Sequence, residues 1–83
     1  MLLQTTSNKK IYPFKVTPFT DPSQALYFLI EVTGGESFLA EREGGYWAKT
    51  TAKHTAESLL NAILHKIERA SIYMSLERIL RLQ

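Results

Sequence analysis

The two histidines are the first residues to consider as metal ligands. His54 and His65 are eleven residues apart in the chain, which on a single helix places them on the same face but about 16 Å apart along the axis. Two histidines that share one zinc ion on a helix need a spacing of three or four residues. Glu57 and Glu68 each follow a histidine by three residues, but neither histidine has a further strong ligand. We therefore expect solvated histidines and no metal site.

Carboxylates and glycines offer the other familiar chemistries. Glu41 and Glu43 lie on the same side of a predicted strand, and paired carboxylates can supply the acid and base of glycoside cleavage. They flank Arg42 just before a glycine pair, which is typical of the charged tip of a hairpin. Neither Gly34-Gly35 nor Gly44-Gly45 matches a phosphate-binding loop, and the chain has no cysteine. We expect a protein that is not an enzyme, with no cofactor and no small-molecule substrate.

Length and composition indicate one small globular domain over residues 1–83. Hydrophobic residues make up 45% of the chain and charged residues 22%, which favours a packed core over disorder. No apolar run approaches the roughly 20 residues that span a bilayer, and Met1 to Lys10 lacks the pattern of a signal peptide. The absence of cysteine suits a reducing compartment, so we expect a cytoplasmic protein that does not enter membranes. Residues 1–8 are polar and are expected to be loosely ordered or added as an edge strand.

The first part of the chain has the two-residue period of β-strands. Pro13 and Pro18 cannot donate ladder hydrogen bonds, so the first of these strands should lie at a sheet edge or end early. Gly34-Gly35 and Gly44-Gly45 are typical of tight turns, which predicts two successive hairpins. The segments with this period are residues 11–19, 26–33, 38–42 and 46–48.

Beyond Lys49 the apolar period changes to that of a helix. We expect this helix to begin near Thr51, with Thr50 or Thr51 as its N-cap. A break near Ser71 would allow a second helix to follow, whereas a strand through Ile72, Met74 and Leu76 is the competing interpretation. The first apolar stripe consists of Ala56, Leu60, Ile63, Ile67, Ala70 and Met74, and the second face of Ile72, Leu76, Ile79 and Leu80.

These patterns predict an α+β fold. An antiparallel meander of three to four strands should be followed by one or two C-terminal helices packed on one sheet face. Tyr27 and Leu29 would then lie on the uncovered face of the strongest strand. Covering one such side chain is worth about 1.5–3 kcal/mol, so a second helix, the N-terminal segment or another chain should cover them.

The apolar surplus indicates a protein-interaction or assembly module that works through a protein partner or as a homodimer. A C-terminal helix with one apolar face would be an effective docking element for either. The residues expected at the interface are Tyr27, Leu29, Ile72, Leu76, Ile79 and Leu80.

Nucleic-acid binding is the alternative function, although a net charge of +2 is a small excess. Aromatic and basic residues occur together where the sheet leads into the helix, and they could stack on bases and contact phosphates. The segment 49–56 resembles the second half of double-stranded-RNA-binding domains, but Thr50 replaces a lysine of that family and its N-terminal helix has no counterpart. The meander leading into a Thr-rich helix start is also similar to small antitoxins of the HicB type. The contacts expected in this case are Tyr46, Trp47, Lys49 and Lys53.

Overall fold

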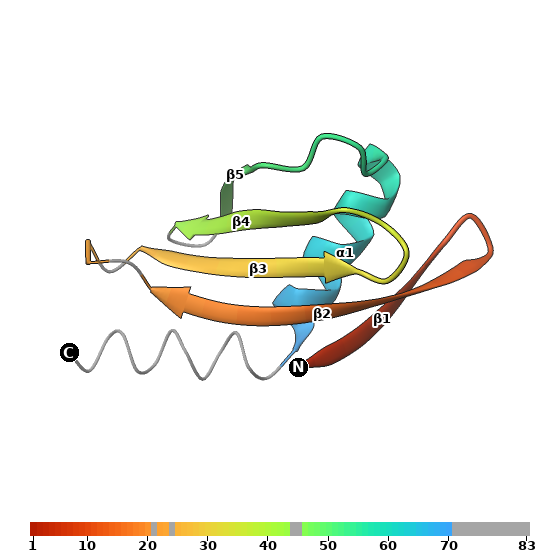
Figure 1. The fold of residues 1–83 in the computed structure, drawn as a ribbon, viewed down its shortest axis with the longest axis horizontal. Helices are drawn as coiled ribbons and strands as arrows, with labels where there is room; N and C mark the ends of the chain where they lie inside the picture. Colours follow the sequence, from red (N-terminus) through yellow and green to blue (C-terminus); the bar gives the residue numbers. More distant parts are fainter. Residues whose placement is uncertain (21, 24, 44–45, 71–83) are drawn as a thin grey trace.

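The computed structural model describes residues 1–20, 22–23, 25–43 and 46–70. They form one antiparallel sheet in which each strand pairs with the next along the chain, followed by one helix (Figure 1). The elements are β1 (Leu2–Ser7), β2 (Lys10–Thr20), β3 (Leu26–Val32), β4 (Ser37–Glu43), β5 (Tyr46–Thr50) and α1 (Glu57–Arg69). The α+β class and the antiparallel meander are confirmed, but the sheet has five strands instead of three to four. The predicted second helix or strand lies outside the described residues, together with Ile72, Leu76, Ile79 and Leu80.

The additional strand is β1, which begins one hairpin that the sequence reading missed. Asn8 and Lys9 connect β1 to β2 with φ values of 51° and 65°, and Ser7 pairs with Lys10. Positive φ at both central residues of a two-residue connection defines the turn that matches the twist of antiparallel strands. Residues 1–8 therefore contain an edge strand, which was one of the two expected outcomes.

The prediction that its prolines place β2 at a sheet edge is wrong, because β2 lies between β1 and β3. Val16 and Met1 exchange both backbone hydrogen bonds, at 2.8 and 2.9 Å. The backbone of Pro18 is also turned toward β1, but it lies two residues beyond this pair. The backbone of Pro13 is turned toward β3, and its carbonyl accepts a 3.0 Å bond from the N–H of Thr33, just past the end of that strand. Each proline therefore lies where the pairing with one neighbouring strand ends, so its missing N–H costs little.

The core lies on one face of the sheet and includes residues of α1. Phe14 and Val16 of β2 are fully buried with Ile63 and Ile67 of the helix, so two members of the predicted helical stripe are core residues. In the same stripe Ala56 is exposed. The buried cluster consists of Phe14, Val16, Leu26, Phe28, Ile30, Val32, Phe38, Ala40, Ile63, Leu64 and Ile67.

Both predicted hairpins after β3 place their strands as expected. Gly34 has a φ of +75°, a conformation that glycine adopts without strain, and β3 and β4 pair antiparallel around it. The strands β4 and β5 also pair antiparallel, with a shift of register between Glu41 and Arg42. The glycine pair at 44–45 lies outside the described residues.

The helix begins at Glu57, six residues after the expected start at Thr51. Its N-cap is Ala56, which makes no side-chain capping bond, so Thr50 and Thr51 do not cap it. Thr50 ends β5, and the hydroxyl of Thr51 instead accepts a 2.9 Å bond from the N–H of Leu39. Residues 51–56 are a connection between sheet and helix.

A carboxylate from the β3–β4 turn holds this connection. Glu36 accepts the N–H groups of Lys53, His54 and Thr55 at 2.6–3.1 Å, and the Thr55 hydroxyl at 2.6 Å. The Thr55 hydroxyl and these three N–H groups lower the pKa of Glu36 from its ordinary 4.5 to about 2. These bonds hold residues 53–55, which lie just before the N-cap Ala56, so one side chain fixes the path of the connection that leads into α1.

Candidate functional site

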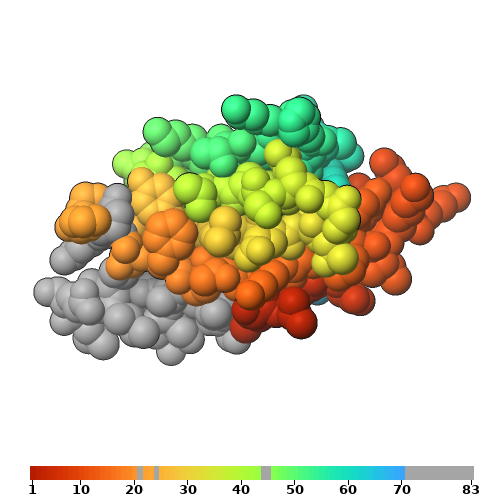
Figure 2. Space-filling model, viewed as in Figure 1, coloured from red at the N-terminus to blue at the C-terminus, as the bar shows by residue number. Residues whose placement is uncertain are grey.

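The sheet face opposite the buried cluster, which we call the open face, carries most of the exposed apolar side chains. Among the described residues, five large hydrophobic side chains are exposed, and all except Met1 lie on it by strand alternation. In Figure 2 the side chains of β2, β3 and β4 make up the middle of this face, and no part of α1 lies over them. The four are Leu2 at 79%, Ile11 at 63%, Tyr46 at 60% and Phe19 at 40% exposure.

The centre of the open face is a patch of neighbouring apolar residues. Phe19 and Tyr27 are paired across strands and stack with ring centroids 5.5 Å apart. Beside them Leu29 pairs with Thr17 on one side and with Leu39 on the other. Tyr27, Leu29 and Leu39 are half-buried. The structure therefore brings the predicted interface residues Tyr27 and Leu29 together on the open face.

Four charged residues on the open face form oppositely charged cross-strand pairs, and a fifth, Glu43, pairs with Tyr46. Lys15 of β2 pairs with Glu31 of β3, and Glu41 of β4 pairs with Lys49 of β5. The first pair borders the apolar centre along the strands, and the second lies beside it, with Glu41 opposite Tyr27. The four charges of the pairs cancel, and Glu43 leaves the face slightly negative. A face of this kind is suited to protein contact and gives no attraction for a polyanion.

The four residues proposed for nucleic-acid contact are not brought onto one surface. Tyr46 and Lys49 lie on the open face, but Trp47 faces the core side, where it meets Phe28 edge to face at 5.4 Å. Lys53 lies in the 51–56 connection. The best base-stacking side chain of the set is therefore occupied by the core.

Arg42 is a buried charged residue whose position was not predicted from the sequence. It is only 8% exposed, its guanidinium lies 5.1 Å from the Trp47 ring centroid, and its Nη1 is 2.7 Å from Oε1 of Glu68. The neighbouring glutamates suggested a charged hairpin tip. Its position two residues after Ala40, in step with Phe38, was the signal that it points toward the core.

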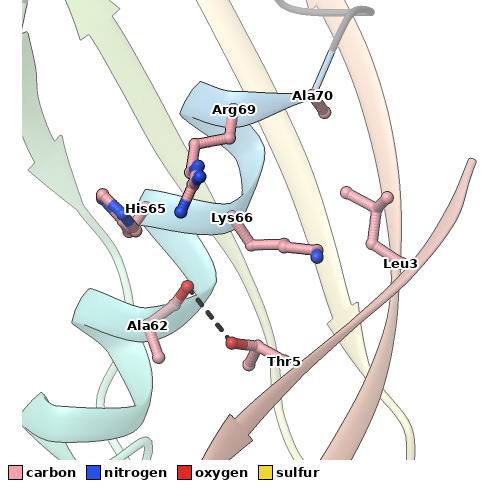
Figure 3. A pocket seen from close by; sticks show the side chains of 7 residues that line it. All are labelled: Leu3, Thr5, Ala62, His65, Lys66, Arg69 and Ala70. Atoms are coloured by element: carbon pink, nitrogen blue, oxygen red, sulfur yellow. Dashed lines mark hydrogen bonds between the residues drawn. The ribbon is translucent and has the colours of Figure 1, made fainter.

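A cleft of about 570 Å³ lies between β1 and α1. Three basic side chains of the last helical turns, His65, Lys66 and Arg69, border it, and the lining residues that the structure describes include no carboxylate. Figure 3 shows Lys66 extending from the helix toward β1, and the Thr5 hydroxyl meeting the carbonyl of Ala62 at 3.5 Å. The cleft is lined by Leu3, Thr5, Ala62, His65, Lys66, Arg69 and Ala70.

In the described part of the chain, no group of three or more His, Cys, Asp or Glu side chains could hold a metal ion. His54 is exposed in the 51–56 connection, and His65 is exposed on α1. Within the same residues, no helix has the length and apolar character needed to cross a bilayer.

No protein family model, curated protein or solved structure matches this chain significantly. The function must therefore be argued from the two surfaces just described, the open face and the basic cleft.

Proposed function

We propose that this protein is a non-catalytic assembly module that forms a homodimer through the open face of its sheet. The observation that carries the proposal is the gathering of exposed apolar side chains on this one face. At its centre Phe19, Tyr27, Leu29 and Leu39 form a contiguous patch across β2, β3 and β4, and contiguous apolar surface marks interaction sites in soluble proteins.

Among the described residues, the helix α1 accounts for the burial of only one sheet face. We infer that α1 covers the core side, because Ile63, Leu64 and Ile67 belong to the same buried cluster as the inward residues of the strands. The opposite side chains keep part of their surface in water. Burying a large apolar side chain fully is worth about 1.5–3 kcal/mol, so a second sheet packed about 10 Å above the first would recover part of this energy.

The arrangement of charges favours a second copy as the occupant. A twofold axis parallel to the strands and midway between β2 and β3 would place Lys15 of one protomer opposite Glu31 of the partner subunit. The same axis stacks the Phe19–Tyr27 pair on its own copy and sets Leu29 against the partner's Thr17. An interface of this symmetry is self-complementary in both charge and apolar content.

The test is the mass in solution, measured by light scattering behind size exclusion. The wild-type chain should be a dimer, and Leu29→Glu should be a folded monomer, because it puts an unpaired charge at the centre of the interface. Ser58→Glu adds the same charge on the exposed side of α1 and should leave the dimer intact. A wild-type chain that is monomeric at about 500 μM, where a Kd in the micromolar range would give dimer, refutes the proposal.

A charge exchange tests the register of the dimer. Lys15→Glu alone and Glu31→Lys alone each place like charges together and should raise the dissociation constant several-fold. The double variant restores opposite charges and should recover most of the affinity. If the double variant dimerises no better than either single variant, the proposed axis is wrong.

A further inference from the structure

The edge strand β1 presents backbone groups for further pairing. It pairs only with β2 among the described residues, and Met1 and Val16 exchange both of their hydrogen bonds. Because bonding alternates along an antiparallel strand, the N–H and C=O groups of Leu2, Gln4 and Thr6 are turned away from β2. A row of such groups is a template for one more strand.

The basic cleft lies beside this same edge. Leu3 and Thr5 of β1 border it from the strand, and Lys66 and Arg69 border it from α1 (Figure 3). A strand added about 4.8 Å from β1 would direct every second side chain to the side of Leu3 and Thr5, and hence toward the helix. The edge and the cleft would therefore act on the same ligand.

The charge of the cleft defines the ligand that fits. His65, Lys66 and Arg69 lie within two turns of one helix, and none of the described residues that line the cleft is acidic. Glu68, the acidic residue of these turns, is bonded to Arg42 on the other side of the helix. Cations near a helix C-terminus also stabilise its dipole, but that effect requires neither a cleft nor an unpaired strand edge.

We propose that an extended acidic peptide segment of a partner protein binds here as a sixth strand on β1. Its outward-turned backbone pairs with Leu2, Gln4 and Thr6, and carboxylates at alternate positions contact Lys66, Arg69 and His65. Main-chain pairing supplies part of the affinity in this mode of recognition, and the alternate side chains supply specificity. The site is separate from the open face, so it does not depend on dimer formation.

The probe is a fluorescein-labelled eight-residue peptide of alternating threonine and glutamate, titrated with the full chain at low salt and followed by fluorescence anisotropy. We expect saturable binding with a Kd below about 1 mM. A probe with glutamine in place of glutamate should bind at least about tenfold more weakly, because hydrogen bonds to charged groups are the stronger ones. A probe of the same composition with glutamates in adjacent pairs should also lose affinity, since only half of its carboxylates face the cleft.

Two variants separate the cleft from general electrostatics. Lys66→Glu should weaken binding at least about tenfold, whereas Lys53→Glu changes the net charge equally at a distant exposed position and should change it less than about twofold. Gln4→Pro removes one outward N–H that β2 does not use, and edge strands tolerate proline. The Gln4→Pro protein should therefore remain folded, and it should bind the probe about as weakly as Lys66→Glu does.

Hydrogen exchange tests the site in the wild-type chain, so the result does not depend on whether a variant folds. With the wild-type chain, saturating probe should slow amide exchange at Leu2, Gln4 and Thr6 and leave the exposed residues of β5 unchanged. The proposal is overturned if the probe does not bind at 1 mM or if the two lysine variants behave alike. Tighter binding of an octathymidylate than of the acidic peptide would assign the cleft to nucleic acid and would equally overturn it.

Discussion

The ion pair between Arg42 and Glu68 connects β4 to α1. Removing Glu68 should show how much this pair contributes to the free energy of unfolding. Arg42 has 6% of its side chain exposed and Glu68 has 33%, with 2.7 Å between Nη1 and Oε1. Breaking a fully buried pair costs about 3–5 kcal/mol, and an exposed pair contributes about 0.2–1 kcal/mol. Because only the arginine end is buried, we expect Glu68→Ala to lower the free energy of unfolding by about 1.5–3 kcal/mol.

A double-mutant cycle measured by urea denaturation isolates the pair. Arg42→Met removes the charge and keeps an unbranched side chain to pack against Trp47, so it should cost less than Glu68→Ala. In the Arg42→Met background, adding Glu68→Ala should cost little, because no buried cation is left behind. Glu57→Ala is the matched control, since it removes an exposed acidic residue from the same helix.

The outcome that refutes this reasoning is specific. If Glu68→Ala costs no more than Glu57→Ala, the carboxylate does not compensate the buried guanidinium. If Arg42→Met costs more than Glu68→Ala, then the arginine stabilises the fold mainly through packing on Trp47 and not through its charge. In either case the position of α1 would have to be fixed by the apolar cluster alone.

Two further substitutions test the connections of the fold. The pKa of Glu36 is lowered to about 2 by the Thr55 hydroxyl and the N–H groups around it, so its contribution is complete above about pH 4.5 and is lost as the pH falls toward 2. Glu36→Gln should therefore flatten the dependence of the urea midpoint on pH in that window, and an unchanged dependence would contradict the assignment. Lys9→Gly should raise stability by up to about 1 kcal/mol, because glycine relieves the strain of a left-handed side-chain residue. Thermal melting should show it, with Lys10→Gly in β2 lowering stability as the control.

The strands best predicted from the sequence are those in which the alternation of residues alone determines which side chains face the core. Leu26 to Val32 places every second residue in the core, and the glycine pair at 34–35 fixes where the chain reverses. For β1 the sequence left an edge strand and loose order as equal alternatives, because its residues Leu2 to Ser7 are mostly polar and only three of them are half-buried. An edge strand with little core contact has no strong pattern to detect.

Features that depend on distant residues could not be predicted. The connection before α1 is held by Glu36, which binds N–H groups 17 to 19 residues further along the chain. The basic cleft depends on β1 meeting α1, and the contact between Thr5 and Ala62 spans 57 residues. Local capping preferences and helical periodicity contain no information about either contact, so Thr51 was a reasonable but incorrect start.

The two edges of the sheet differ in a way that bears on where a partner strand could add. β5 has five residues, contains Lys49, and is shifted in register against β4 so that Ala48 has no partner. Short length, an edge lysine and an irregularity are the features by which proteins prevent unwanted strand pairing. β1 is only one residue longer, but it has neither a charge nor a proline and pairs with β2 without a register shift. It therefore lacks the edge lysine and the irregularity, yet it lies beside the basic cleft. Among the described residues, the unprotected edge thus lies next to three basic side chains. This arrangement supports the proposed acidic partner, because the cleft would repel a basic segment at the same edge.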